Sequence, residues 1–180
     1  MRHAAYALAL WAVTAGSATC GAGDFVGPGL RLEQYGLYCP SDKVGEEDAP
    51  GTERGKIDLI EGAPQLIASV TTVPAIQDIA FGLRYRLAEG AEPVTAYVVM
   101  QHPPFGTPPV TVERYAVLVN DQSLTLSQFS FDMPYEMVLG TWVLQVEIDG
   151  ETVIQKTFEV VPPEQSPFSL KMCRGPALMS

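Results

Sequence analysis

The chain has 180 residues, 47% of them apolar, and a formal net charge of −10 at pH 7. This length suits one domain of ordinary size with enough chain to bury a hydrophobic core. The surplus of acids repels phosphate backbones and anionic lipid headgroups, so the charge disfavours nucleic-acid binding and attraction to a membrane surface.

The first residues have the three-part layout of a secretory signal peptide. Arg2 is followed by an apolar run from Ala4 to about Ala15 and then by small residues. The run has roughly a dozen residues, short of the ~20 that span a bilayer as a helix, and no later stretch is long enough either. A short buried helix is the alternative, but it leaves the small residues unexplained. We therefore predict a signal peptide over residues 1–22, export to the periplasm or the extracellular space, and no transmembrane segment.

The cleavage site decides how many cysteines the exported protein has. Small residues permit a cut after Ala18 or after Ala22, and only the second removes Cys20. A lipoprotein cut just before Cys20 is a third option, which the preceding residues fit poorly. In an oxidising compartment the remaining pair, Cys39 and Cys173, is expected to form a disulfide that ties the C-terminal tail to the first strand.

Short alternating apolar runs, punctuated by proline and glycine, predict an antiparallel all-β domain. In the clearest strand, the odd-numbered residues 79–87 share one apolar face. Other strands are expected at residues 94–101, 112–119 and 123–131, with weaker candidates at 30–38, 57–60 and 66–71. About seven such strands predict an immunoglobulin-like β-sandwich over residues 23–165, with a C-terminal tail over 166–180. A small β-barrel is the alternative.

The last two strands lie on either side of Asp149 and Gly150. A two-residue turn would pair even-numbered with odd-numbered residues, which puts the apolar residues of the two strands on opposite faces. Because both apolar sets are even-numbered, we expect a three-residue loop of Ile148, Asp149 and Gly150, with a bulge at Gly150. Lys156 is the exception on this face, so it is expected near a sheet edge or with its amine turned outward.

Four segments carry a resemblance to a known family: YGLYC, TTVPAIQDIAFGLRYRL, HPPFG and LGTWVLQVEIDGETVIQKTFEVV. Together they look like the bacterial family catalogued as domain of unknown function 3859, over about residues 30–162. The resemblance rests on the order and spacing of glycine, proline and aromatic positions. It implies an exported β-sandwich, and it supplies no catalytic or ligand-binding residues.

Metal, cofactor and nucleophile chemistry find little support in the sequence. Outside the predicted signal peptide, His102 is the one histidine. One histidine and a bridged cysteine pair cannot form the three- or four-ligand sites that zinc prefers. A catalytic triad would have to use His102, yet the chain has no Gly-x-Ser-x-Gly motif. We expect no metal and no cofactor.

The segment His102, Pro103, Pro104 and Phe105 stands out as a loop shaped by its prolines, with an imidazole and a phenyl ring at or near the surface. Rigid aromatic loops on a β-scaffold suit recognition, because little entropy is lost on binding. The alternative is a loop that ends a strand, in which the prolines block edge pairing and Phe105 covers the core.

Two acidic features suggest other chemistry. The segment 41–55 could offer calcium ligands but lacks the spacing of an EF-hand loop, so a solvated charged loop is favoured. Glu136 lies among aromatic and aliphatic residues, where a satisfied carboxylate at a strand end is more common than an acid catalyst. The candidate calcium ligands are Asp42, Glu46, Glu47 and Asp48.

These observations favour a non-enzymatic exported module that binds or stabilises an envelope protein or glycan. The alternative is a glycan-acting enzyme that uses a pair of carboxylates. An enzyme requires a pocket with two facing acids and perturbed pKa values. A binding module would instead have an exposed apolar patch or an unprotected sheet edge.

Overall fold

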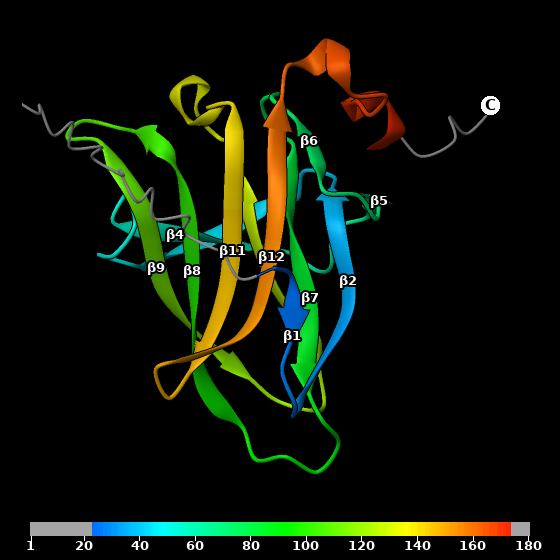
Figure 1. The fold of residues 1–180 in the computed structure, drawn as a ribbon, viewed down its shortest axis with the longest axis vertical. Coiled ribbons are helices and arrows are strands. Elements are labelled where there is room, and N and C mark those ends of the chain that lie inside the picture. The colour runs from blue at the N-terminus through cyan, green and yellow to red at the C-terminus, as the bar shows by residue number, and fades with distance from the viewer. Residues whose placement is uncertain (1–22, 174–180) are drawn as a thin grey trace, which may run out of the picture.

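A computed structural model describes residues 23–173 as a sandwich of two β-sheets (Figure 1). The predicted signal peptide, with Cys20 and both cleavage sites, lies outside the described residues, as do residues 174–180 of the predicted tail. The predicted all-β sandwich is confirmed, and the barrel alternative is wrong because the sheets do not close. Across residues 23–173, the structure has no helix with the length and apolar character needed to cross a membrane.

The larger sheet has six strands. Five of them follow one another in the order β1 (Phe25–Val26), β12 (Glu151–Val161), β11 (Gly140–Ile148), β8 (Val94–Phe105) and β9 (Val110–Val119). These neighbours are antiparallel, whereas the sixth strand, β6 (Thr72–Pro74), runs parallel to the end of β12. The strand β9 is therefore left as one edge of this sheet.

The smaller sheet has four strands, in the order β10 (Thr125–Ser130), β7 (Ala80–Leu87), β2 (Leu30–Tyr38) and β5 (Leu66–Ala68). Its edge strand β10 lies on the same side of the molecule as β9. A separate hairpin of β3 (Lys43–Asp48) and β4 (Lys56–Ile60) is inserted between β2 and β5. Three short 3₁₀ turns complete the described chain: η1 (Pro134–Glu136), η2 (Pro163–Gln165) and η3 (Leu170–Cys173).

The sheets pack on an aromatic core. The apolar face predicted for residues 79–87 is confirmed, since its five side chains are at most 6% exposed. Trp142 is fully buried, and its indole N–H donates to the carbonyl of Val138 at 3.1 Å. The ring centroids of Phe81, Phe129 and Phe131 lie 4.8–5.9 Å from that of Trp142. Aromatic contacts at these distances stabilise the core beyond the burial of area.

The final hairpin confirms the predicted pairing but not the predicted loop. Trp142 pairs with Phe158 and Val146 with Ile154, so even-numbered residues do face each other. The three-residue loop is wrong: Ile148 pairs with Glu151 across a two-residue turn, in which Asp149 and Gly150 have φ of 53° and 82°. Both residue types tolerate this left-handed conformation, which matches the twist of the strands. The extra residue is a bulge in β12, at the register shift beside Val146.

Lys156 lies near a sheet edge with its amine turned outward, as expected. Its Nζ is 2.8 Å from a carboxylate oxygen of Asp24 and 4.0 Å from the centre of the Tyr35 ring. Asp24 comes directly before β1, which pairs with β12 on the side away from β11. The apolar stem of Lys156 therefore covers the core while its charge reaches a partner.

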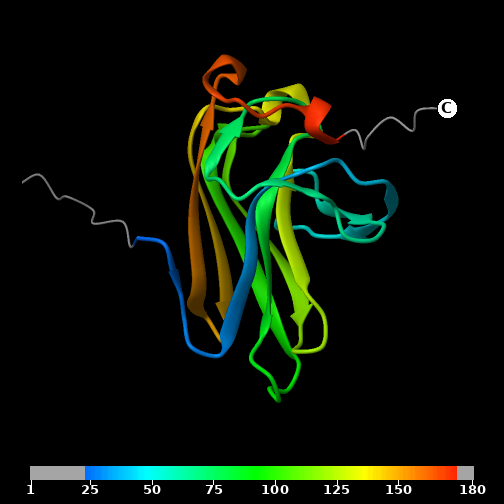
Figure 2. The same cartoon turned by 90° about the vertical axis from the view of Figure 1, so that its right-hand side faces the viewer.

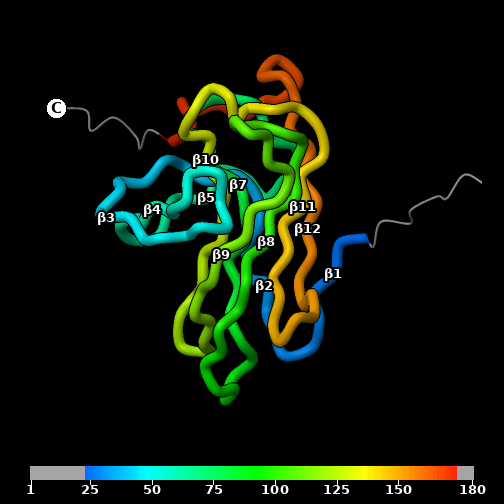
Figure 3. The backbone as a smooth tube through the Cα atoms, turned by 90° about the vertical axis from the view of Figure 1, so that its left-hand side faces the viewer, coloured from blue at the N-terminus to red at the C-terminus, as the bar shows by residue number. Residues whose placement is uncertain are grey.

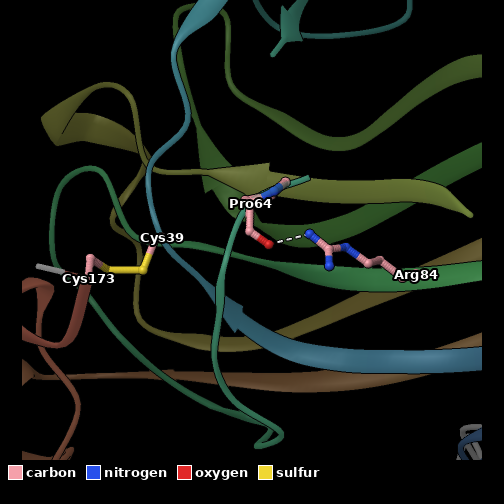
Figure 4. Close-up of a disulfide and its surroundings, with 4 residues drawn as sticks. All are labelled: Cys39, Pro64, Arg84 and Cys173. Carbon is pink, nitrogen blue, oxygen red and sulfur yellow. Dashed lines mark hydrogen bonds between the residues drawn. A yellow bond between two sulfur atoms is a disulfide. The ribbon is translucent and has the colours of Figure 1, made fainter. Parts of the chain in front are cut away.

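The predicted disulfide between Cys39 and Cys173 is present, with 5.4 Å between the two Cα atoms (Figure 4). It joins the end of β2 to the end of η3, at the point where the chain leaves for the β3–β4 hairpin. The returning chain is fixed close by: the backbone N–H of Cys39 donates to Gln65, and the Arg84 guanidinium donates to the carbonyl of Pro64. The root of the hairpin is thus held on both sides.

Replacing both cysteines by serine is expected to lower the free energy of unfolding by about 2–5 kcal/mol, because the bridge restricts the unfolded chain across a long loop. Guanidinium unfolding at pH 7 measures the difference. Reducing agent should shift the midpoint of the unmodified protein and leave that of the double variant unchanged. Equal stability of the oxidised protein and the double variant would contradict this prediction.

Candidate binding groove

One side of the sandwich is open, because β9 and β10 are edge strands of different sheets and do not pair with each other. They lie side by side in Figure 3, where the hairpin of β3 and β4 projects beside them. Figure 2 shows this hairpin standing clear of the two sheets. We call residues 41–61 the flap. The flap, β9 and residues 123–130 enclose a groove of about 740 Å³.

The groove has apolar side chains on all three of its walls. Leu118 of β9, Leu124 before β10 and Leu59 of the flap are 64%, 48% and 42% exposed. Further apolar lining comes from Ile57, Ile60, Val117 and Leu126. Grouped exposed apolar side chains are typical of surfaces that bind another molecule. The groove therefore has the apolar character that is expected of a binding module.

The backbone edge of β9 is open within this groove. The N–H of Arg114 points away from β8 and donates to the carbonyl of Gly51 in the flap at 2.8 Å. Because backbone groups alternate sides along a strand, those of Ala116 and Leu118 also point outward. Neither residue has a hydrogen-bond partner on that side within residues 23–173. The flap thus uses one position of the edge and leaves the next two free.

A cluster of four charged side chains holds the flap to the sandwich. Asp132, which follows β10, accepts from Lys43 at 2.8 Å and from Arg54 at 3.0 Å. Asp58 of the flap accepts from the same two bases at 2.8 Å and 3.0 Å. Burial raises the pKa of Asp58, but the hydrogen bonds from Lys43 and Arg54 more than offset this, so its pKa lies below the usual range.

Glu113 fastens the tip of the flap to β9. Its side chain is 8% exposed and accepts a hydrogen bond of 2.8 Å from the backbone N–H of Glu53. Burial raises the pKa of Glu113, and the hydrogen bond from Glu53 only partly opposes this. The hydroxyl of Tyr135 donates to the Glu53 side chain at 3.0 Å. Residues of β9 and η1 therefore both hold the flap loop.

Glu136 lines the same groove and is 3% exposed. Its carboxylate accepts a 2.8 Å hydrogen bond from the backbone N–H of Met133, which agrees with the expectation of a satisfied carboxylate, although Glu136 lies in η1 and not at a strand end. Burial raises the pKa of Glu136 to about 7. Glu113 and Glu136 are thus two buried carboxylates of raised pKa on the walls of one groove.

The segment 102–105 differs from the exposed loop that we expected. It continues β8, with a register shift between Gln101 and Phe105, and its two rings turn inward. His102 is 6% and Phe105 5% exposed. The imidazole stacks against Phe105, at 4.2 Å, and against Trp142, at 4.8 Å, and burial lowers its pKa. The expectation of exposed rings is wrong because these aromatic contacts outweigh solvation of the imidazole.

The prolines of this segment stay nearer the surface. Pro104 is exposed and Pro103 is half-buried, with its carbonyl 2.9 Å from Nδ1 of His102. The burial of Phe105 agrees with the alternative in which this ring covers the core. Recognition by residues 102–105 stays a prediction. The rings of His102 and Phe105 are buried, so they are not available to contact a ligand.

The segment 41–55 is also more ordered than expected. A loop is wrong for residues Lys43–Asp48, which form β3 and pair with β4, although this strand is largely exposed to solvent. Glu46 accepts from Lys56 at 2.6 Å, which places one of the candidate calcium ligands in an ion pair. Within residues 23–173, no three histidine, cysteine or acidic side chains gather as ligands for a metal ion.

Comparison with known proteins agrees with this architecture. An immunoglobulin-like protein from Pseudomonas aeruginosa has a similar structure, with a TM-score of 0.50 and 21% sequence identity over 73% of this chain and 96% of that protein. This likeness shows the fold alone, and it confirms the predicted immunoglobulin-like sandwich. Residues 27–160 match the family described as Domain of unknown function (DUF3859), so the chain belongs to that family, as the resemblance implied. The comparison with curated proteins found no match.

Sequence reasoning missed the residues that hold the flap. Asp132 and Arg54 are 78 residues apart, and nothing in either local sequence links them. Glu113 did carry a signal, because it shares a strand face with Tyr115 and Val117. A carboxylate on an otherwise apolar strand face indicates a buried acid with a specific partner.

The raised pKa of Glu136 predicts a pH-dependent stability. Ionising Glu136 opposes folding, so its effect is absent below about pH 4.5, grows as the pH rises from there to about 7, and is constant above that. Glu136→Gln is therefore expected to be about 1–3 kcal/mol more stable, relative to the unmodified protein, at pH 8 than at pH 5. Urea unfolding at both pH values measures this difference.

The exposed Glu164 of η2 provides the matched control. Glu164→Gln should leave the pH dependence of unfolding unchanged. An equal pH dependence in the unmodified protein and Glu136→Gln would contradict the raised pKa.

Proposed function

We propose that this protein is a non-enzymatic binding module, exported to the cell envelope, that holds an envelope component in the groove beside the flap. The observation that carries the proposal is the pair of open sheet edges, β9 and β10, beside a groove with exposed apolar walls. Open edges and grouped apolar side chains are costly for a protein that only has to be stable, since they favour aggregation. Binding of another molecule would explain why this protein has open edges and exposed apolar side chains here.

Two features support export. The N-terminal residues have the composition and order of a signal peptide, with Arg2 ahead of a short apolar run. The Cys39–Cys173 bridge belongs to a class of bond that persists in oxidising compartments and is rare in the cytosol. An acidic domain with such a bridge suits the periplasm or the extracellular space.

Site-specific photo-crosslinking in living cells tests the proposal. A photoreactive amino acid replaces Leu118, which lines the groove, or Val112, which is 51% exposed on the same strand outside the groove. We expect the probe at Leu118 to capture one discrete envelope component that the probe at Val112 does not. Excess unlabelled protein should abolish the capture. The same adducts from both positions, or none from Leu118, would contradict a binding role for the groove.

A glycan-acting enzyme is the second candidate, and a specific observation favours it. Glu113 and Glu136 are buried carboxylates that line one groove, and burial raises the pKa of both, as an acid catalyst requires. However, each carboxylate already accepts a backbone hydrogen bond, from Glu53 and from Met133. These contacts explain the two acids as supports of the flap and of η1.

Incubation with purified cell-wall glycan separates the two candidates. The binding proposal predicts no release of reducing ends above a protein-free control. Release that disappears in both Glu113→Gln and Glu136→Gln, and persists in Glu164→Gln, would establish the enzyme instead.

A further inference from the structure

We propose that the groove binds an extended, lysine- or arginine-containing segment of a partner protein, which pairs with β9 as an added strand. This inference rests on the proposed function and specifies the ligand. It requires three things of the groove: a free backbone edge, pockets for alternate side chains, and negative charge beside the edge. Each of these is found at Ala116 and Leu118 or next to them.

One outward backbone group of β9 already pairs with another part of the protein. Gly51 of the flap accepts the outward N–H of Arg114, as a residue of an added strand would. The contact is close, since a Cβ on Gly51 would lie 2.4 Å from the Arg114 carbonyl oxygen. The outward groups of Ala116 and Leu118 continue the same edge without a partner in the described chain. A bound strand would therefore extend this sheet in line with Gly51.

Alternate side chains of an added strand would meet different surroundings. Those that point toward the sandwich would face Val117 of β9 and Phe129 of β10, both of which line the groove and pack against the core. Those that point the other way would leave the apolar interior. An alternating apolar and polar sequence fits this division, because side chains alternate faces along a strand.

The unbalanced charge of the groove is negative. Its three basic residues are already paired: Lys43 and Arg54 with Asp58 and Asp132, and Lys56 with Glu46. Glu47 and Asp78 also line the groove, and neither has an ion-pair partner within residues 23–173. Glu47 and Ala116 also both line a smaller hollow next to the groove. A cationic segment complements this arrangement.

The flap favours a single strand over a second copy of the sandwich. It projects beside β9 and β10 and contacts β9 at Arg114 (Figure 3). A folded sheet approaching this edge would meet the flap, which is a common way for natural sheets to avoid edge-to-edge pairing. A single extended segment needs only one strand's width along β9 beyond Gly51.

Binding of synthetic heptapeptides to the protein without its predicted signal peptide, residues 23–180, tests the inference. The probe is Lys-Val-Lys-Val-Lys-Val-Lys, with blocked ends. Its controls are the same pattern with glutamate for lysine, a peptide of the same composition in two blocks, and the probe with N-methylated valines, which cannot donate backbone hydrogen bonds. Amide hydrogen exchange and chemical shifts measured by NMR report the site.

We expect the probe at saturation to slow exchange of the Ala116 and Leu118 N–H groups at least about tenfold and to leave Val112, at the same edge outside the groove, unchanged. Ala116→Pro removes the outward donor and should weaken binding at least about tenfold, whereas Val112→Pro should change it less than about twofold. The three control peptides should bind at least about tenfold more weakly than the probe.

Several results would overturn the inference: no binding of the probe in millimolar excess, unchanged exchange at Ala116 and Leu118 when it binds, or equal binding of the control peptides. The exchange measurement needs no variant, so it decides even if Ala116→Pro fails to fold. Retained capture at Leu118 in cells, with failure of the probe, would leave a groove that binds by another mode, such as to a glycan. Loss of both would also remove the proposed function.

Discussion

The position of the flap beside the groove depends on one carboxylate above all, that of Asp132. It accepts from Lys43 and from Arg54, at 2.8 Å and 3.0 Å, and so joins the flap to the end of β10. Charge-assisted hydrogen bonds of this kind are among the stronger polar contacts in proteins. Without them the flap would keep the contacts at its root around the disulfide and, nearer its tip, those with Glu113, Arg114 and Tyr135. This carboxylate supplies the charged contact that keeps the flap beside two sheet edges that do not pair, and so helps to form the groove.

The buried acids of the groove also follow from this arrangement. A flap of charged residues can lie against an apolar sandwich only if its backbone and charges find partners. The Glu113 carboxylate accepts a hydrogen bond from the backbone N–H of Glu53, and the Glu136 carboxylate accepts one from the backbone N–H of Met133. Their raised pKa values result from burial at these supporting positions. Perturbed carboxylates in a groove suggest catalysis, yet here they have a structural use.

Sequence patterns predicted the sandwich well and the groove poorly, for physical reasons. The alternation in β7 and the even-numbered faces of the last hairpin are local signals of burial, and the structure confirms both. The bulge in β12 escaped prediction because a turn and a later bulge produce the same pairing as a three-residue loop. β3 was missed because its acidic residues have low strand propensity and owe their order to pairing with β4. His102 was misplaced because stacking against Trp142 is a tertiary contact.

At Ala116 and Leu118 the outer edge of β9 has no partner within residues 23–173, whereas its inner edge is paired with β8. Amide hydrogen exchange of the free protein tests this most directly, because it reports each backbone N–H separately. The structure predicts an alternating pattern: slow exchange at Tyr115 and Val117, which face β8, and fast exchange at Ala116 and Leu118. Protection of Ala116 and Leu118 equal to that of Tyr115 would mean that this edge is already occupied and cannot accept a further strand.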